Sequence, residues 1–200
     1  MRILLSVFLF LLSFNSFSQN QDFFDKVSAH RSQQNIEKLD SLSSPLKKED
    51  RESFKGLEFF KADKSYAINC KFKKKIGEVF DMATSSGQIR KYRKYGTLKF
   101  KLNGEKFKLS VYQNMSLMKI PMYKDYLFVP FTDNTNGESS YDGGRYVDFK
   151  IPNYKIVELD FNLCYNPYCS YNDGYSCPIP PSENYLNTKI EAGEKAYKKH

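Results

Sequence analysis

The chain has 200 residues, a formal net charge of +8, 16% aromatic residues and no tryptophan. A chain of this length suits one domain rather than a multidomain organisation. The excess positive charge lies in residues 71–108, where there are twelve Lys or Arg and only three acidic residues.

Residues 1–18 are predicted to be a secretory signal peptide. Arg2 precedes an apolar run at residues 3–14, and Ser16 and Ser18 are the small residues that a signal peptidase requires, so we expect cleavage after Ser18. The apolar run is too short to cross a bilayer, and no later segment is long and apolar enough to do so. We therefore expect an exported, periplasmic or secreted protein whose domain is residues 19–200.

An exported protein rarely meets nucleic acid, so we expect no nucleic-acid partner. The basic region instead suits an anionic small molecule, an envelope glycan, a lipid head group or a cell-wall polymer. The simpler alternative is a solvated surface. The sequence leaves the oligomeric state open.

The first part of the domain, about residues 21–55, is predicted to be a helical cap. Apolar residues recur near helical spacing from Phe23 to Leu42. Pro45 ends this helix because the residue before a proline is disfavoured in the helical region. A second short helix is expected after Pro45, toward Phe54.

The clearest strand signal is a hairpin around Asn103-Gly104, the preferred pair for a two-residue turn. Residues 96–102 and 105–111 alternate between apolar and polar on either side of it. A two-residue loop sets the register, which puts Phe100 opposite Phe107 on the buried side.

The same register predicts like charges directly opposite each other on the outer face of the hairpin. The pairs are Lys99 with Lys108 and Lys101 with Lys106. Such pairs destabilise a sheet by a few tenths of a kcal/mol each. Either the lysines discourage edge pairing or an anion lies across this face.

Further strands are predicted at residues 126–131, 145–149 and 154–161. No strand–helix units repeat along the chain. The predicted fold class is therefore mainly β (α+β): an N-terminal helical cap, a β-rich body over about residues 64–165 and a long irregular C-terminal segment at 163–200. The body is expected to be an antiparallel β barrel or sandwich.

The C-terminal segment contains three of the four cysteines, and an exported chain can form disulfides. Cys169 with Cys177 is the first choice because the intervening residues can curl back. Cys164 with Cys169 is also possible. Cys70, on the apolar face of a strand, is either a buried thiol or a partner for Cys164. No cysteine spacing fits a zinc site, and no metal or other cofactor is expected.

A Gly-Gly-Arg sequence suggests an anion pocket because glycines allow close backbone approach and arginine binds carboxylate or phosphate. The alternative is that this arginine bridges to Asp133 or Asp160. An oxygen-rich loop at residues 133–138 lacks the residue order of a calcium loop. The predicted ligand-binding residues are Gly143, Gly144 and Arg145 as the pocket floor, Asp133, Asn162 and Tyr165 as orienting groups, and the Cys169–Cys177 loop as a wall.

The sequence has no nucleophile elbow and no zinc-protease motif, so the catalytic residues, if there are any, are unknown. Acid–base chemistry would have to come from carboxylates such as Asp133, Asp148 and Asp160.

An ordered series of short motifs resembles the uncharacterised bacterial family called domain of unknown function 1684. The motifs are Ser44-Pro45-Leu46, Phe54-Lys55-Gly56-Leu57, Phe131-Thr132-Asp133, Gly144-Arg145-Tyr146, Leu159-Asp160-Phe161-Asn162, Tyr165-Asn166-Pro167, Cys177-Pro178 and Ala192-Gly193-Glu194-Lys195. The resemblance implies one compact domain and brings no activity. Because Cys70 and Cys164 depart from the family pattern, it favours Cys169 and Cys177 as the disulfide pair.

The function expected from these observations is binding of a small anionic or glycan ligand by an exported domain. The first alternative is a carboxylate-dependent hydrolase of cell-envelope material. The second is a structural or assembly protein that docks through the lysine-rich face of the hairpin.

Overall fold

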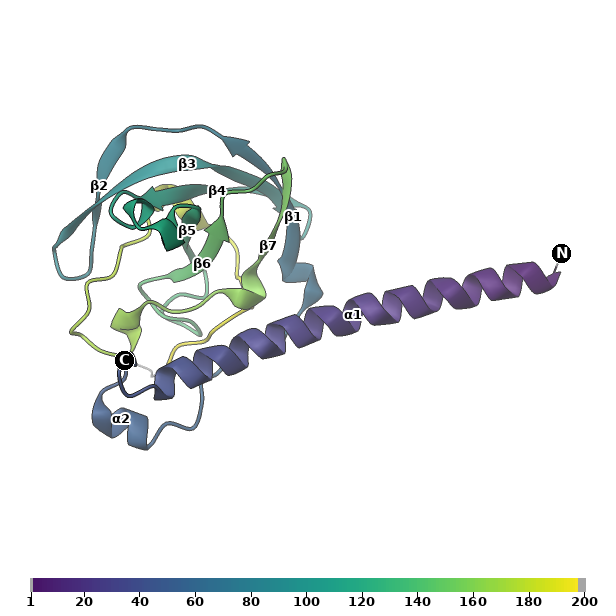
Figure 1. The fold of residues 1–200 in the computed structure, drawn as a ribbon, viewed down its shortest axis with the longest axis horizontal. Coiled ribbons are helices and arrows are strands. Elements are labelled where there is room, and N and C mark those ends of the chain that lie inside the picture. The colour runs from purple at the N-terminus through teal and green to yellow at the C-terminus, as the bar shows by residue number, and fades with distance from the viewer. Residues whose placement is uncertain (1, 198–200) are drawn as a thin grey trace.

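The computed structural model describes residues 2–197, with side chains described from residue 21 onward. Figure 1 shows a curled β-sheet beside one long helix, whose first half extends beyond the body. The predicted signal peptide lies in that half, outside the residues whose side chains are described. Within the part of the chain that the structure describes, no helix is long and apolar enough to cross a membrane.

Helix α1 (Arg2–Leu39) is followed by the short helix α2 (Lys48–Glu52). Phe23 and Val27 bury the inner face of α1, whereas Ile36 is 61% exposed. The helix ends three residues earlier than predicted because Asp40 accepts hydrogen bonds from the backbone of Leu42 and the hydroxyl of Ser43. These local contacts compete with a further turn of helix.

Eight strands form the sheet, and six of them follow the spatial order β6-β5-β4-β3-β1-β7. Strand β2 pairs with β3 outside this path, and β8 adds a short parallel pair to β5. The bounds are β1 Ala67–Lys74, β2 Val79–Ala83, β3 Ile89–Leu102, β4 Glu105–Asn114, β5 Tyr126–Asp133, β6 Arg145–Lys150, β7 Ile156–Asp160 and β8 Tyr185–Leu186.

The two ends of the curled sheet are linked by the chain that follows β7. Tyr146 on β6 and Tyr165 exchange both backbone hydrogen bonds, at 2.9 and 3.0 Å. The predicted mainly β fold with a helical cap is confirmed, and the body is a curled half-barrel rather than two stacked sheets.

The predicted hairpin is confirmed residue by residue. Phe100 lies opposite Phe107, and both lysine pairs face each other as the turn requires. Asn103 and Gly104 have φ values of +50° and +85°, as a type I′ turn demands. The sequence of the turn therefore sets the register of the longest strand pair.

Strand β3 bends at a bulge between Lys94 and Gly96. Before the bulge, Tyr92 packs into an aromatic cluster with Phe128 and Tyr146. After it, Leu98 and its neighbours enter the main core between the sheet and the tail. A bulge bends a strand in this way, and here it allows one strand to serve both clusters.

The irregular tail is part of the core. Ile190 and Ala192 are completely buried. The Asn184 amide oxygen accepts from the Ser110 backbone N–H at 2.7 Å, and its Nδ2 donates to the Ser110 carbonyl at 2.9 Å and to the Pro130 carbonyl at 2.7 Å. The side chain is completely buried. The tail therefore fastens β4 to β5.

Gly96 sits where β1 and β3 approach closely. A β-carbon there would lie 2.7 Å from the Phe72 ring and 2.8 Å from the Lys73 carbonyl oxygen. We expect Gly96→Ala to lower the free energy of unfolding by about 1–3 kcal/mol through overpacking, measured by urea denaturation. Gly77→Ala is the control, since its β-carbon would make only an ordinary 3.5 Å contact. Equal effects of both substitutions would contradict this account.

Candidate functional site

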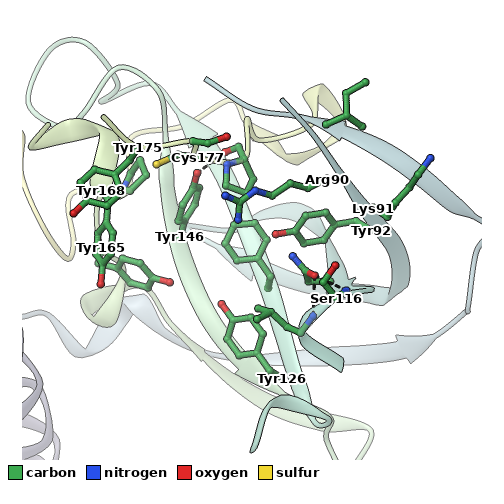
Figure 2. A pocket seen from close by; sticks show the side chains of 17 residues that line it. Arg90, Lys91, Tyr92, Ser116, Tyr126, Tyr146, Tyr165, Tyr168, Tyr175 and Cys177 are labelled. Atoms are coloured by element: carbon green, nitrogen blue, oxygen red, sulfur yellow. Dashed lines mark hydrogen bonds between the residues drawn. The ribbon is translucent and has the colours of Figure 1, made fainter. Parts of the chain in front are cut away.

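A cavity of about 620 Å³ opens beside the aromatic cluster. Its walls come from the first residues of β3, the end of β4, strands β5 and β6, and two pieces of the tail. Figure 2 shows the tyrosines of these elements converging on one space. The aromatic residues that line it are Tyr92, Tyr126, Phe128, Tyr146, Tyr165, Tyr168 and Tyr175.

The rings hold one another in place through edge-to-face contacts. The ring centroids of Phe128 and Tyr146 are 4.6 Å apart, and those of Tyr146 and Tyr165 are 5.9 Å apart. Tyr168 and Tyr175 form a second such pair at 5.1 Å. Such contacts favour a fixed arrangement of rings, so the cavity has a stiff, largely apolar wall.

Three of the phenols use their single proton inside the protein. Tyr126 and Tyr165 both donate to the same oxygen of Asp148, at 2.7 and 2.6 Å. Tyr146 donates to the carbonyl of Pro178. A phenol whose proton is taken can offer only its oxygen as an acceptor, so these groups suit a ligand with hydroxyl or amine hydrogens.

These three phenols also stay neutral. Burial raises the pKa of Tyr126, Tyr146 and Tyr165 well above the usual value near 10, and the charge of Asp148 raises those of Tyr126 and Tyr165 further. They are therefore protonated near neutral pH and are not available there as nucleophiles or bases.

Arg90 brings positive charge to this cavity. In Figure 2 its side chain extends across the pocket toward Tyr146, whereas that of Lys91 points away. Lys91 is paired with Asp81, but no carboxylate oxygen lies within 4.0 Å of Arg90 among the described residues. The guanidinium is thus available to an anionic group.

The disulfide between Cys169 and Cys177 is present, with a Cα–Cα distance of 6.2 Å. Cys177 and its neighbours Tyr175 and Pro178 line the aromatic cavity. The predicted disulfide is confirmed, and the residues near Cys177 border the aromatic cavity rather than Arg145. The remaining cysteines, Cys70 and Cys164, are buried free thiols, and burial raises their pKa to about 12 and about 11.

The structure does not gather the six predicted ligand-binding residues around one cavity. Only Tyr165 lines the aromatic pocket. Asn162 is buried, and its side-chain amide is hydrogen-bonded to the backbone of Asp63 and to the carboxylate of Asp160. Gly144 has a φ of +88° and is buried, whereas Gly143 is exposed.

Arg145 has the structural role that the sequence left open as the alternative. It is completely buried, and its Nη2 lies 2.8 Å from Asp133 Oδ2. The same guanidinium donates to the carbonyls of Ile190 and Ala192, at 2.8 and 2.6 Å. Asp133 in turn accepts from Thr135 and from the backbone of Ile190. An external anion could reach Arg145 only by displacing Asp133.

A second cavity of about 460 Å³ separates α1 from β6 and β7 and shares Tyr165 and Tyr168 with the first. His30 lines it, and burial lowers the pKa of this imidazole below 6.5. Asp160 also lines it, 3.6 Å from Lys26. Among the described residues, no group of three or more His, Cys, Asp or Glu could hold a metal ion.

Sequence reasoning missed most of the aromatic cavity because its residues are far apart in the chain. Tyr126 lies in a strand that was predicted only as buried, and Tyr92 lies in the first half of β3, before the predicted strand at residues 96–102. The available signal was the high tyrosine content of the chain, 15 residues.

Comparison with known proteins identifies the family. The family model "Protein of unknown function (DUF1684)" matches residues 52–195. The chain belongs to this family. DUF1684 membership confirms the resemblance seen in the sequence motifs, and it assigns no activity.

A solved structure shares this fold. The solution NMR structure of the uncharacterized protein from gene locus rrnAC0354 of Haloarcula marismortui has a TM-score of 0.69 and 33% sequence identity, and the alignment covers 92% of this chain and 99% of that one. Among curated proteins, none matches this chain significantly. The fold of this chain is thus shared with a protein described as uncharacterized.

Removing the buried guanidinium should unfold much of the tail. We expect Arg145→Ala to lower the free energy of unfolding by about 3–5 kcal/mol, because Asp133 would be left as an unpaired buried charge. Arg90→Ala is the control, and a change within about 0.5 kcal/mol is expected there. Chemical denaturation of both variants tests this; an unchanged stability of Arg145→Ala would contradict the structural role.

Glu194 should make stability depend on pH. It is completely buried, and burial raises its pKa above the usual 4.5. The folded state thus binds this proton more tightly than the unfolded chain, so the contribution is present below pH 4.5 and is lost as the pH rises through the folded-state pKa. We expect the wild type to lose stability relative to Glu194→Gln as the pH rises from 4.5. Denaturation midpoints at three pH values test this, and a constant difference would refute it.

Proposed function

We propose that this DUF1684 protein is a binding domain for a small saccharide that carries an acidic group, held in the aromatic cavity. The observation that carries the proposal is the combination of a tyrosine-lined cavity of about 620 Å³ with an arginine that has no carboxylate partner among the described residues. Clefts of about 300–1,000 Å³ are the usual size for small-molecule sites.

Three properties of the cavity support this class of ligand. The ring faces can pack against the apolar face of a sugar ring. The oxygens of Tyr126, Tyr146 and Tyr165 can accept hydrogen bonds from sugar hydroxyls, since their own protons are committed. Arg90 can hold a carboxylate or phosphate with two parallel hydrogen bonds.

A cationic ligand would suit the aromatic rings as well. Arg90 disfavours it because a second positive charge in the same cavity would be repelled. An acidic saccharide can both pack its sugar ring against the aromatic rings and pair its acidic group with Arg90.

A carboxylate-dependent hydrolase has less support from the geometry. Asp133 is enclosed with Arg145, and one oxygen of Asp148 already accepts hydrogen bonds from two phenols. Asp160 and Asp148 both line the second cavity, but Asp133 does not. The three carboxylates therefore do not meet around one substrate position.

Export of the protein is part of the proposal. The apolar segment at residues 3–14 supports it, and so does a disulfide, which persists in oxidising compartments. N-terminal sequencing of protein recovered from outside the cytoplasm should show Gln19 as the first residue. A retained Met1 in that fraction would refute cleavage.

The binding role can be tested with glucose, glucuronic acid and glucose 6-phosphate in calorimetric titrations. We expect the acidic sugars to bind more tightly than glucose. Arg90→Gln should weaken acidic-sugar binding by roughly 10–100-fold, the value of a charge-assisted hydrogen bond, and leave glucose binding unchanged. Arg93→Gln is the matched control, because Arg93 lies on the same strand but is bound to Gln113. Equal losses in both variants, or no binding of any of these sugars, would refute the proposal.

A further inference from the structure

Five lysines cover the outer face of three neighbouring strands, and we call them the lysine face. All five are exposed, and they border one shallow depression. They are Lys71 on β1, Lys99 and Lys101 on β3, and Lys106 and Lys108 on β4.

The register places these charges side by side. Lys99 has Lys71 directly opposite on one side and Lys108 directly opposite on the other. Lys101 faces Lys106 in the same way. Like charges opposite each other destabilise a sheet, so the fold carries three unfavourable pairs on one face.

Protection of a sheet edge does not account for this arrangement. Lysines on an edge strand prevent pairing with other chains, and this explanation can apply to Lys106 and Lys108. It fails for Lys99, because β3 is paired on both sides at that residue. The central lysines need another reason.

Neighbouring acidic groups do not neutralise the face. Over the residues with described side chains, no carboxylate oxygen lies within 4.0 Å of any of the five ammonium groups. Glu158 on the adjacent strand β7 is occupied by Lys26 of helix α1. The positive charge is thus open to an external anionic partner.

An apolar side chain lies in the same row as the lysines. Ile156 on β7 is directly opposite Lys71 and is 58% exposed. It borders the same depression as Phe107, which is half-buried. Basic residues interspersed with exposed apolar side chains are typical of surfaces that lie at a membrane interface. A soluble anionic polymer would pair with the lysine charges, but it would not bury the exposed side chain of Ile156.

We propose that the lysine face binds the surface of an anionic lipid bilayer. The ammonium groups lie against the lipid phosphates, and Ile156 enters the boundary between head groups and acyl chains. This surface is built by β1, β3, β4 and β7, whereas the aromatic cavity involves the tail and the start of β3. Membrane binding and ligand binding can therefore succeed or fail separately.

The test is co-sedimentation of the purified protein with vesicles of phosphatidylcholine alone or mixed with phosphatidylglycerol. We expect the mixed vesicles to bind the protein more tightly, and added salt to weaken that binding. The variant Lys71→Gln/Lys99→Gln/Lys108→Gln should lose on the order of 100-fold in affinity for the mixed vesicles, given the contribution of a lysine near an anionic surface. Its melting temperature should be unchanged or higher, because like-charge pairs are removed.

The control variant Lys47→Gln/Lys48→Gln/Lys55→Gln removes the same charge from exposed positions elsewhere, and its vesicle affinity should change less than threefold. Ile156→Ser should weaken vesicle binding several-fold without changing the salt dependence. An equal loss in the control, or no preference for anionic vesicles, would overturn the proposal. Binding of dextran sulfate through the same lysines without binding to vesicles would also overturn it, in favour of an anionic polymer as partner.

Discussion

The buried contact between Arg145 and Asp133 joins two neighbouring strands to the irregular C-terminal tail. Asp133 ends β5, Arg145 begins β6, and the carbonyls that complete the network belong to Ile190 and Ala192 in the tail. A buried ion pair is favourable only when its remaining hydrogen-bonding positions are filled. The tail supplies carbonyl partners for both Nη atoms of Arg145, and these buried hydrogen bonds hold the irregular segment against β5 and β6.

This constraint shapes the aromatic cavity indirectly. Once β6 and the tail are joined, Tyr146 and Tyr165 exchange backbone hydrogen bonds and their rings meet at right angles. The disulfide then holds the outer part of the tail, where Cys177 forms part of the cavity wall. The cavity therefore lies where the tail closes the half-barrel, beside the bulge that turns the first half of β3 toward it.

The aromatic cavity and the lysine face, the two proposed binding surfaces, arise in different ways. The aromatic cavity depends on long-range packing, and its only unpaired cation among the described residues is Arg90. In the lysine face, the turn Asn103-Gly104 fixes which of the four hairpin lysines meet, and Lys71 joins them through the pairing of β1 with β3. A change in the tail should thus alter the cavity while the lysine face persists.

The sequence by itself determined the elements and contacts that are encoded over short distances. Strand alternation predicted the β-rich fold, and the Asn-Gly turn pair predicted the hairpin register. The spacing of Cys169 and Cys177 predicted the disulfide. The predicted ligand-binding set did not come together as a cavity, because Arg145 had several chemically reasonable partners, an external anion, Asp133 or Asp160, and it pairs with Asp133. Which one it met depended on where the tail carbonyls lie, and the tyrosine cavity depended on the curl of the sheet. Only the tertiary structure decided these, since neither leaves a periodic pattern in the chain.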